Sequence, residues 1–133
     1  MWLGAWGLGR INWVEAAGPA LRVAIVQGNI DQDVKWRPNR LDETLERYIE
    51  LSLPEHGHSD VIVWPETAIP AFYQDIVPFL DVLGEKARQD RVDYVTGIPT
   101  GSRETELFHN SVITIGQSTA FYHKRRLLPF GEY

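Results

Sequence analysis

Apolar residues follow two alternating patterns along most of the chain: continuous runs, and spacings of three to four residues. The continuous runs, which are typical of strands, are residues 21–27, 60–64 and 92–96. The helical spacings predict one helix over Leu41–Ile49, capped by Asn39, and a second over Ile76–Ala87. Gly97 is expected to end the third strand. This β-α-β-α-β order favours a largely parallel sheet, and the continuous apolar run at residues 60–64 is expected of a strand covered on both faces.

A different pattern begins after the third strand. The stretch FHNSVITIGQSTAFYHK, residues 108–124, predicts two strands joined at Gly116, because glycine tolerates the positive φ of a tight turn. Alternation along the second of these strands puts Tyr122 and Lys124 on one face. The fold class predicted is therefore α/β, with a β-hairpin after the β-α-β-α-β part and no internal domain boundary.

Composition limits the classes of function. The chain has 133 residues, 44% of them hydrophobic and 23% charged, which is enough for one domain with its own core. A net charge of −5 argues against a nucleic-acid partner, whose binding surface would be basic. The chain has no cysteine, so it contains neither disulfides nor thiolate zinc sites.

The first 20 residues are expected to lie outside the domain. MWLGAWGLG, residues 1–9, is apolar but far shorter than the roughly 20 residues that cross a bilayer, and it lacks the basic start of a signal peptide. Two interpretations stay open. The segment is either a frayed tail, which its composition favours, or the interfacial end of a membrane segment further upstream, since Trp prefers the membrane–water boundary.

Glu66 is the first candidate for chemistry. It lies in VIVWPETAIP, directly after the second strand, because Pro65 holds Trp64 extended and then breaks the strand. Open α/β sheets bind ligands beyond the carboxyl ends of their strands. A carboxylate among apolar neighbours would be partly desolvated, which suits a general base or acid. The alternative is a solvent-exposed residue at the start of a helix.

Two charged residues near the end of the chain are further candidates. Lys124 ends the last predicted strand beside Arg125 and Arg126, so the alternative to a functional role is a solvated basic cluster. Glu132 follows a Phe-Gly bend and could equally be a plain loop carboxylate. Neither residue, taken alone, defines a site.

The remaining polar motifs do not indicate a metal or cofactor. His56 and His58 form a His-x-His pair, but they lie in a polar loop without an evident third ligand. Asn110 is central in a predicted strand and is expected to be a hydrogen-bonded core residue. We therefore predict no cofactor and no metal.

Three motifs together resemble the nitrilase superfamily, and specifically its apolipoprotein N-acyltransferase branch. They are VAIVQGNIDQDVKW, WPETAIP and YHKRRLLPFGEY, and the resemblance covers residues 21–133. It implies an α-β-β-α sandwich carrying a Glu-Lys-Cys triad, in which Glu66 and Lys124 match the Glu and the Lys. The chain would then be the amino-terminal part of the catalytic domain, with the nucleophilic cysteine outside these 133 residues.

The resemblance also implies a reaction. A cysteine thiolate takes an acyl chain from a phospholipid as a thioester, and the acyl chain passes to the α-amino group of the diacylglyceryl-cysteine of an apolipoprotein. Glu66 would be the base and Lys124 would stabilise the oxyanion. Glu132 and Trp36 would have supporting roles, although Trp36 fits core packing equally well. The branch works at the bacterial inner membrane, with its catalytic domain on the periplasmic side and membrane segments outside residues 21–133.

Two other functions stay open from the sequence. One is a soluble carbon–nitrogen hydrolase of the same superfamily, which would use the same triad on an amide. The other is a non-catalytic fragment that binds a partner or a lipid. In either enzymatic interpretation, the 133 residues alone are expected to be inactive, because they contain no thiol.

Overall fold

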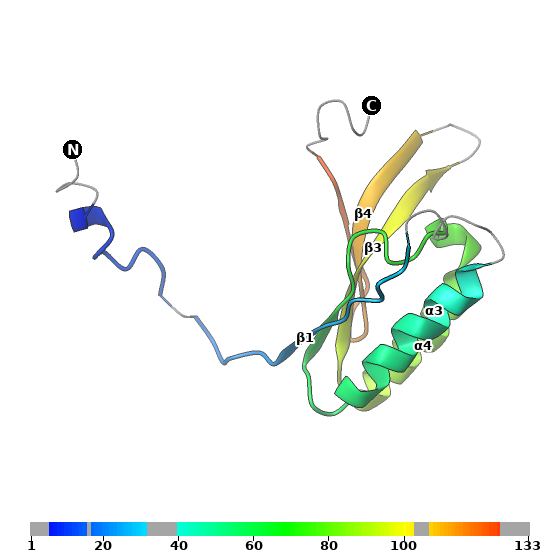
Figure 1. Cartoon of the computed structure of the whole chain (residues 1–133), viewed down its shortest axis with the longest axis horizontal. Coiled ribbons are helices and arrows are strands. Elements are labelled where there is room, and N and C mark those ends of the chain that lie inside the picture. The colour runs from blue at the N-terminus through cyan, green and yellow to red at the C-terminus, as the bar shows by residue number, and fades with distance from the viewer. Residues whose placement is uncertain (1–5, 16, 32–39, 103–106, 126–133) are drawn as a thin grey trace.

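The computed structural model describes residues 6–15, 17–31, 40–102 and 107–125. Its helices and strands, in chain order, are β1 (Val23–Ile25), α3 (Leu41–Ser52), the 3₁₀ turn η2 (Leu53–Glu55), β2 (Val61–Val63), the 3₁₀ turn η3 (Tyr73–Asp75), α4 (Val77–Asp90), β3 (Asp93–Ser102), β4 (Leu107–Ile115) and β5 (Ala120–His123). Figure 1 shows α3 and α4 on one side of the sheet.

The five strands form one sheet in the order β1-β2-β3-β4-β5. β1, β2 and β3 pair in parallel, whereas β3, β4 and β5 pair antiparallel. The parallel strands need crossover connections, and α3 and α4 supply them. The predicted α/β class, the parallel first half and the hairpin at Gly116 are confirmed. The described residues form one sheet and one helix layer, which are two of the four layers of the expected sandwich.

The core lies between the helices and one face of the sheet. Each helix presents a stripe at helical spacing: the buried residues are Thr44, Leu45, Tyr48 and Ser52 on α3, and Leu80, Leu83, Gly84 and Ala87 on α4. The sheet contributes every second residue of its strands to the same core, namely Ile62, Trp64, Tyr94, Ile98, Ile113 and Ile115. This alternation is the strand period of two that directs successive side chains to opposite faces.

Two predicted boundaries were wrong. β3 does not end at Gly97 but continues to Ser102, because β4 pairs with it along its whole length, from Tyr94↔Ile115 to Ser102↔Leu107. The N-cap of α3 is Arg40, not Asn39, which lies outside the described residues.

The second face of the sheet is uncovered, which corrects the expectation that the strand at residues 60–64 is covered on both faces. Among the described residues, no helix packs on this face (Figure 1). Ile25 is therefore 82% exposed, Val23 53% and Val112 40%, whereas Ile62, on the helix side, is fully buried. The candidate site lies on this open face.

The segment before β1 extends away from the sheet and helices (Figure 1). Its described residues are exposed throughout, including Trp6 and Trp13. In the part of the chain that the structure describes, no helix combines the length and apolar character needed to cross a bilayer.

Candidate active site

A tight turn carries Glu66 beyond the carboxyl end of β2. The Trp64 N–H donates to the Val95 carbonyl at 2.9 Å and so continues the pairing with β3 for one more residue. Pro65 then breaks the ladder, because it has no N–H to donate. The Ala68 N–H closes the turn on the Pro65 carbonyl at 3.1 Å, and Ala68 itself is fully buried. Glu66 is thus held between two anchored residues.

The backbone of this turn is strained and lies directly against β3. Thr67 has φ +52, a left-handed conformation that costs a β-branched residue roughly 1–3 kcal/mol. A Cβ on Gly97 would lie 2.4 Å from the Thr67 nitrogen and 2.8 Å from the Glu66 Cα. Only glycine at position 97 therefore allows the turn to approach β3 this closely.

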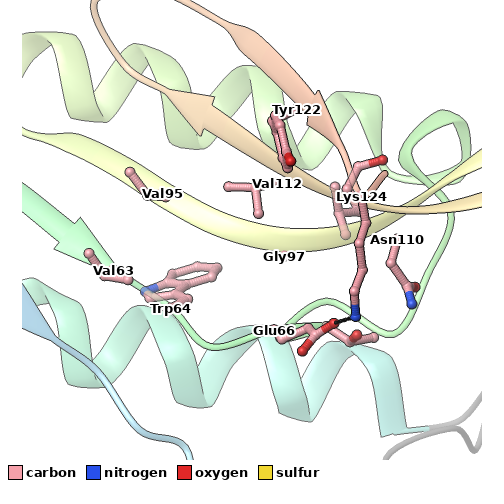
Figure 2. Close-up of a pocket in the computed structure, with 12 residues that line it drawn as sticks. Val63, Trp64, Glu66, Val95, Gly97, Asn110, Val112, Tyr122 and Lys124 are labelled. Carbon is pink, nitrogen blue, oxygen red and sulfur yellow. Dashed lines mark ion pairs between the residues drawn. The ribbon is translucent and has the colours of Figure 1, made fainter. Parts of the chain in front are cut away.

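Lys124 reaches the same place from β5, which is separated from β2 by β3 and β4. It follows β5 directly, and its N–H donates to the Asn110 carbonyl of β4 at 2.8 Å, which extends the pairing. Its side chain runs past Gly97 toward the turn, and Nζ lies 3.5 Å from Glu66 Oε1 (Figure 2). Two residues far apart in the sequence are therefore an ion pair.

The pair is accessible to solvent. The Glu66 side chain is 68% exposed and that of Lys124 28%. The expected desolvation of Glu66 is therefore wrong for the described chain, because Glu66 projects to the uncovered face of the sheet. Exposed ion pairs contribute little to stability, commonly about 0–1 kcal/mol. The pair matters as an arrangement of a proton acceptor and a cation rather than as a structural tie.

A cavity of about 300 Å³ adjoins the pair (Figure 2). Its apolar wall includes Val63, Val95 and Val112, one from each of three neighbouring strands, and Lys124 and Glu66 lie at its edge. A base and a cation beside an apolar recess suit acyl chemistry, in which a proton is removed and negative charge develops on a carbonyl oxygen.

Other predicted residues lie elsewhere. Trp36 and Glu132 are outside the described residues, so their supporting roles remain predictions. Asn110 was expected in the core, but it is half-buried and lines the cavity beside Lys124, because it faces the uncovered side of the sheet. Arg125 is exposed.

The His-x-His pair is not arranged as a metal site. His56 Nδ1 lies 2.5 Å from Asp90 Oδ2 and Nε2 lies 2.5 Å from the Tyr94 hydroxyl, so both ring nitrogens are engaged. His58 is exposed. The described residues contain no group of three or more His, Cys, Asp or Glu that could hold a metal ion.

Sequence reasoning missed Thr67 and Gly97. The signal for Gly97 was present, since a lone glycine inside a strand pattern often marks close approach of another backbone. It was interpreted as a strand end instead. Nothing in the sequence marks Thr67, because threonine ordinarily avoids positive φ.

Comparison with known proteins identifies the family. Residues 22–133 match the model of the carbon-nitrogen hydrolase family. The chain belongs to the carbon-nitrogen hydrolase family. The predicted resemblance to the nitrilase superfamily is thereby confirmed.

Several curated relatives of the chain carry one name. The chain is 39% identical over 132 residues to an apolipoprotein N-acyltransferase of Methylococcus capsulatus, a match that covers 98% of this chain and 26% of that protein. It is 39% identical over 127 residues to the one from Coxiella burnetii, covering 96% of this chain and 26% of that protein. The chain thus spans about a quarter of the length of these relatives.

Solved structures of carbon-nitrogen hydrolases share the fold. A carbon-nitrogen hydrolase from Helicobacter pylori G27 superimposes with a TM-score of 0.59 at 17% identity, over 85% of this chain and 42% of that chain. An N-terminal amidase superimposes with a TM-score of 0.56 at 18% identity, over 82% of this chain and 28% of that chain. These similarities confirm the nitrilase-like fold class.

Proposed function

We propose that Glu66 and Lys124 are the base and the cation of a cysteine-dependent acyl transfer, and that the reaction is N-acylation of apolipoproteins. The observation that carries this proposal is the 3.5 Å contact between Glu66 Oε1 and Lys124 Nζ beside an apolar cavity, at the carboxyl end of β2. The reaction class is supported by the names of the relatives, which are apolipoprotein N-acyltransferases. The nucleophile would be a cysteine on a segment outside these 133 residues.

In the first half-reaction, Glu66 takes the proton of the cysteine thiol. The thiolate attacks the ester carbonyl of a phospholipid acyl chain, and Lys124 Nζ stabilises the negative charge on the tetrahedral oxygen. When the intermediate collapses, the C–O bond breaks and Glu66 returns its proton to the lysophospholipid oxygen. The acyl chain is then held as a thioester.

In the second half-reaction, an amine replaces the ester. The α-amino group of a diacylglyceryl-cysteine attacks the thioester carbonyl and gives up a proton to Glu66. The C–S bond breaks, the amide forms, and the proton on Glu66 neutralises the departing thiolate. Every proton that leaves a nucleophile therefore passes through Glu66, and both oxyanions form beside Lys124.

The setting of this reaction is part of the proposal. Residues 1–20 would link the domain of residues 21–133 to a membrane segment upstream, at the periplasmic side of the bacterial inner membrane. Trp36 and Glu132 would support the site, with Glu132 orienting Lys124 or the amine and Trp36 lining the acyl channel. No metal or cofactor takes part in either half-reaction.

Amide hydrolysis is the second candidate. The chain has the fold of N-terminal amidases, and water in place of the amine would use the same base and cation. The two candidates differ in substrate: the transferase takes its acyl group from a phospholipid ester, whereas the hydrolase cleaves a C–N bond.

The test is to compare the 133-residue chain with a protein extended through the cysteine-bearing segment. Both would be assayed with a labelled phospholipid and a diacylglyceryl peptide, and separately with a peptide that starts with asparagine. We expect acyl transfer by the extended protein and no turnover by the cysteine-free chain. Turnover by the 133-residue chain would overturn the mechanism, and peptide deamidation without acyl transfer would establish the hydrolase instead.

A further inference from the structure

A buried serine on the helix side of the sheet connects the end of α3 to the turn after β2. Ser52 is the last residue of α3 and is fully buried. Its hydroxyl donates to the Tyr48 carbonyl at 2.7 Å and accepts the indole N–H of Trp64 at 2.9 Å. One oxygen thus ties Trp64, the residue directly after β2, to the end of α3.

Trp64 is fixed more tightly than packing alone would achieve. Its indole lies between two aromatic rings, 5.1 Å from Tyr48 and 5.3 Å from Tyr94, the second contact edge-to-face. Such contacts allow a ring to slide, whereas the bond from Nε1 to Ser52 fixes its rotation. Trp64 directly precedes Pro65, which begins the turn that carries Glu66.

A second chain of hydrogen bonds holds Tyr94, whose ring packs edge-to-face on Trp64. The Tyr94 hydroxyl contacts His56 Nε2 at 2.5 Å, and His56 Nδ1 contacts Asp90 Oδ2 at 2.5 Å. The carboxylate can only accept, so His56 Nδ1 carries a hydrogen and donates it. The His56 hydrogen bond holds the pKa of Asp90 below its ordinary value, and burial raises the pKa of Tyr94 to about 12. The tyrosine therefore keeps its proton.

The same cluster supports the end of β1. The Tyr48 ring lies against the backbone of Gly28, where an added Cβ would lie 2.9 Å from Tyr48 Cζ. The carboxyl ends of two neighbouring strands thus rest on one buried cluster. Because close-packed interiors transmit strain, this buried cluster sets the position of the turn that carries Glu66 beyond β2.

We propose that Ser52 is a positioning residue for Glu66: it fixes Trp64, and through Trp64 the start of the Pro65–Glu66 turn, while Tyr94, held by His56, packs against the same indole. This inference rests on the proposed role of Glu66 in acyl transfer. Small displacements of a catalytic group can cost roughly 10²-fold in rate. Ser52 would therefore affect turnover without touching the substrate.

The experiment compares Ser52→Ala with Ser59→Ala in the cysteine-bearing protein. Ser59 is a matched control, since it is also buried and its hydroxyl makes a single side-chain bond, to Glu55 at 3.1 Å. We expect Ser52→Ala to lower kcat by roughly 10- to 100-fold with KM nearly unchanged. Ser59→Ala should keep kcat. Ser52→Thr should keep kcat close to that of the unmodified protein, because the threonine hydroxyl can still bond the carbonyl four residues earlier.

Trp64→Phe provides a second and independent variant. It removes the indole donor and leaves Ser52 in place, so the double variant with Ser52→Ala should lose no more activity than either single variant. Additive losses, or equal kcat for Ser52→Ala and Ser59→Ala, would overturn the positioning role. Glu66→Gln, measured alongside, separates the two proposals. If it remains active, the proposed function fails; if it is inactive while Ser52→Ala behaves as the control, only the positioning role fails.

Discussion

Glu66 and Lys124 meet through backbone geometry rather than through mutual attraction. Their side chains are 68% and 28% exposed, so the 3.5 Å contact is worth little to stability. What brings them together is the tight turn after β2 and the pairing of Lys124 with Asn110 at the end of β5. An ion pair that the fold holds in place although it adds little to folding stability is typical of residues kept for chemistry.

Lys124 is predicted to be required for thioester formation, whereas its basic neighbour Arg125 is not. Lys124→Met keeps most of the stem and removes the charge beside the developing oxyanion, so thioester formation should fall by roughly 10²–10³-fold. Arg125→Met is the control, because Arg125 is exposed and adjacent. Rates of acyl-enzyme formation would be measured for both in the cysteine-bearing protein. Equal losses would indicate a basic surface patch instead of a site residue.

Gly97 is predicted to be irreplaceable even by alanine. The added methyl would meet the Thr67 nitrogen at 2.4 Å and push the Glu66 turn off β3. We expect the free energy of unfolding to fall by roughly 1–3 kcal/mol, the usual cost of overpacking, with a loss of turnover as well. Gly7→Ala is the control, since nothing lies within 4 Å of its added methyl. Urea denaturation and kcat would be measured on both variants in the cysteine-bearing protein. A Gly97→Ala protein with the same free energy of unfolding and the same kcat as Gly7→Ala would contradict the prediction.

At the level of elements, the periodicity of apolar residues predicted which helices and strands form, but it did not predict all of their boundaries. Helices α3 and α4 follow from apolar residues at helical spacing, and the two strands of the hairpin from Gly116 between them. The end of β3 was wrong because pairing with β4, a long-range contact, overrides the breaking tendency of Gly97. The Asn39 cap was wrong by one residue, which is the ordinary uncertainty of helix ends.

β1 is a three-residue strand, and a charged pair at its start is predicted to stabilise its pairing with β2. The Arg22 N–H and guanidinium both donate to Asp60, each at 2.8 Å, and these bonds hold the pKa of Asp60 below its ordinary value. Because the folded pKa is depressed, the stabilisation is present above the unfolded pKa of about 4. It is lost as pH falls through the folded pKa.

Asp60→Asn should therefore lower the free energy of unfolding at pH 7. The difference from the unmodified chain should shrink as the pH falls from about 4 toward the lower folded pKa, and it should vanish below that pKa, where Asp60 is protonated in both states. Urea denaturation over a pH series measures this difference. Asp81→Asn, at an exposed position on α4, is the control. A difference for Asp60→Asn that stays constant across the series would show that the charge of Asp60 is not the cause.

At the scale of the whole molecule, the sequence predicted the fold class and that Tyr122 and Lys124 share one face of the sheet. It left open whether Glu66 would be exposed, because apolar neighbours in the sequence cover a carboxylate only if another layer closes over it. Nor did it mark the hydrogen-bonded chain of Tyr94, His56 and Asp90, since His56 was noted only as part of a His-x-His pair. These residues meet only when α4 and β3 pack against the turn that follows α3.

The uncovered face of the sheet exposes apolar side chains to solvent. Val23, Ile25 and Val112 are exposed there, on the face opposite the helices. Apolar sheet surface of this kind favours association, so we predict that the isolated 133-residue chain is poorly soluble or associated. In the expected α-β-β-α sandwich, a second sheet would cover this face and enclose the Glu66–Lys124 pair.

The most direct measurement is the accumulation of the acyl-thioester in the cysteine-bearing protein with Glu66→Gln. The substitution keeps the shape of the side chain and removes the base, and labelled phospholipid reports the thioester by mass spectrometry. Loss of acid–base help should slow thioester formation by roughly 10²–10⁴-fold. Thioester formation at close to the unmodified rate would contradict the assignment of Glu66 as the base.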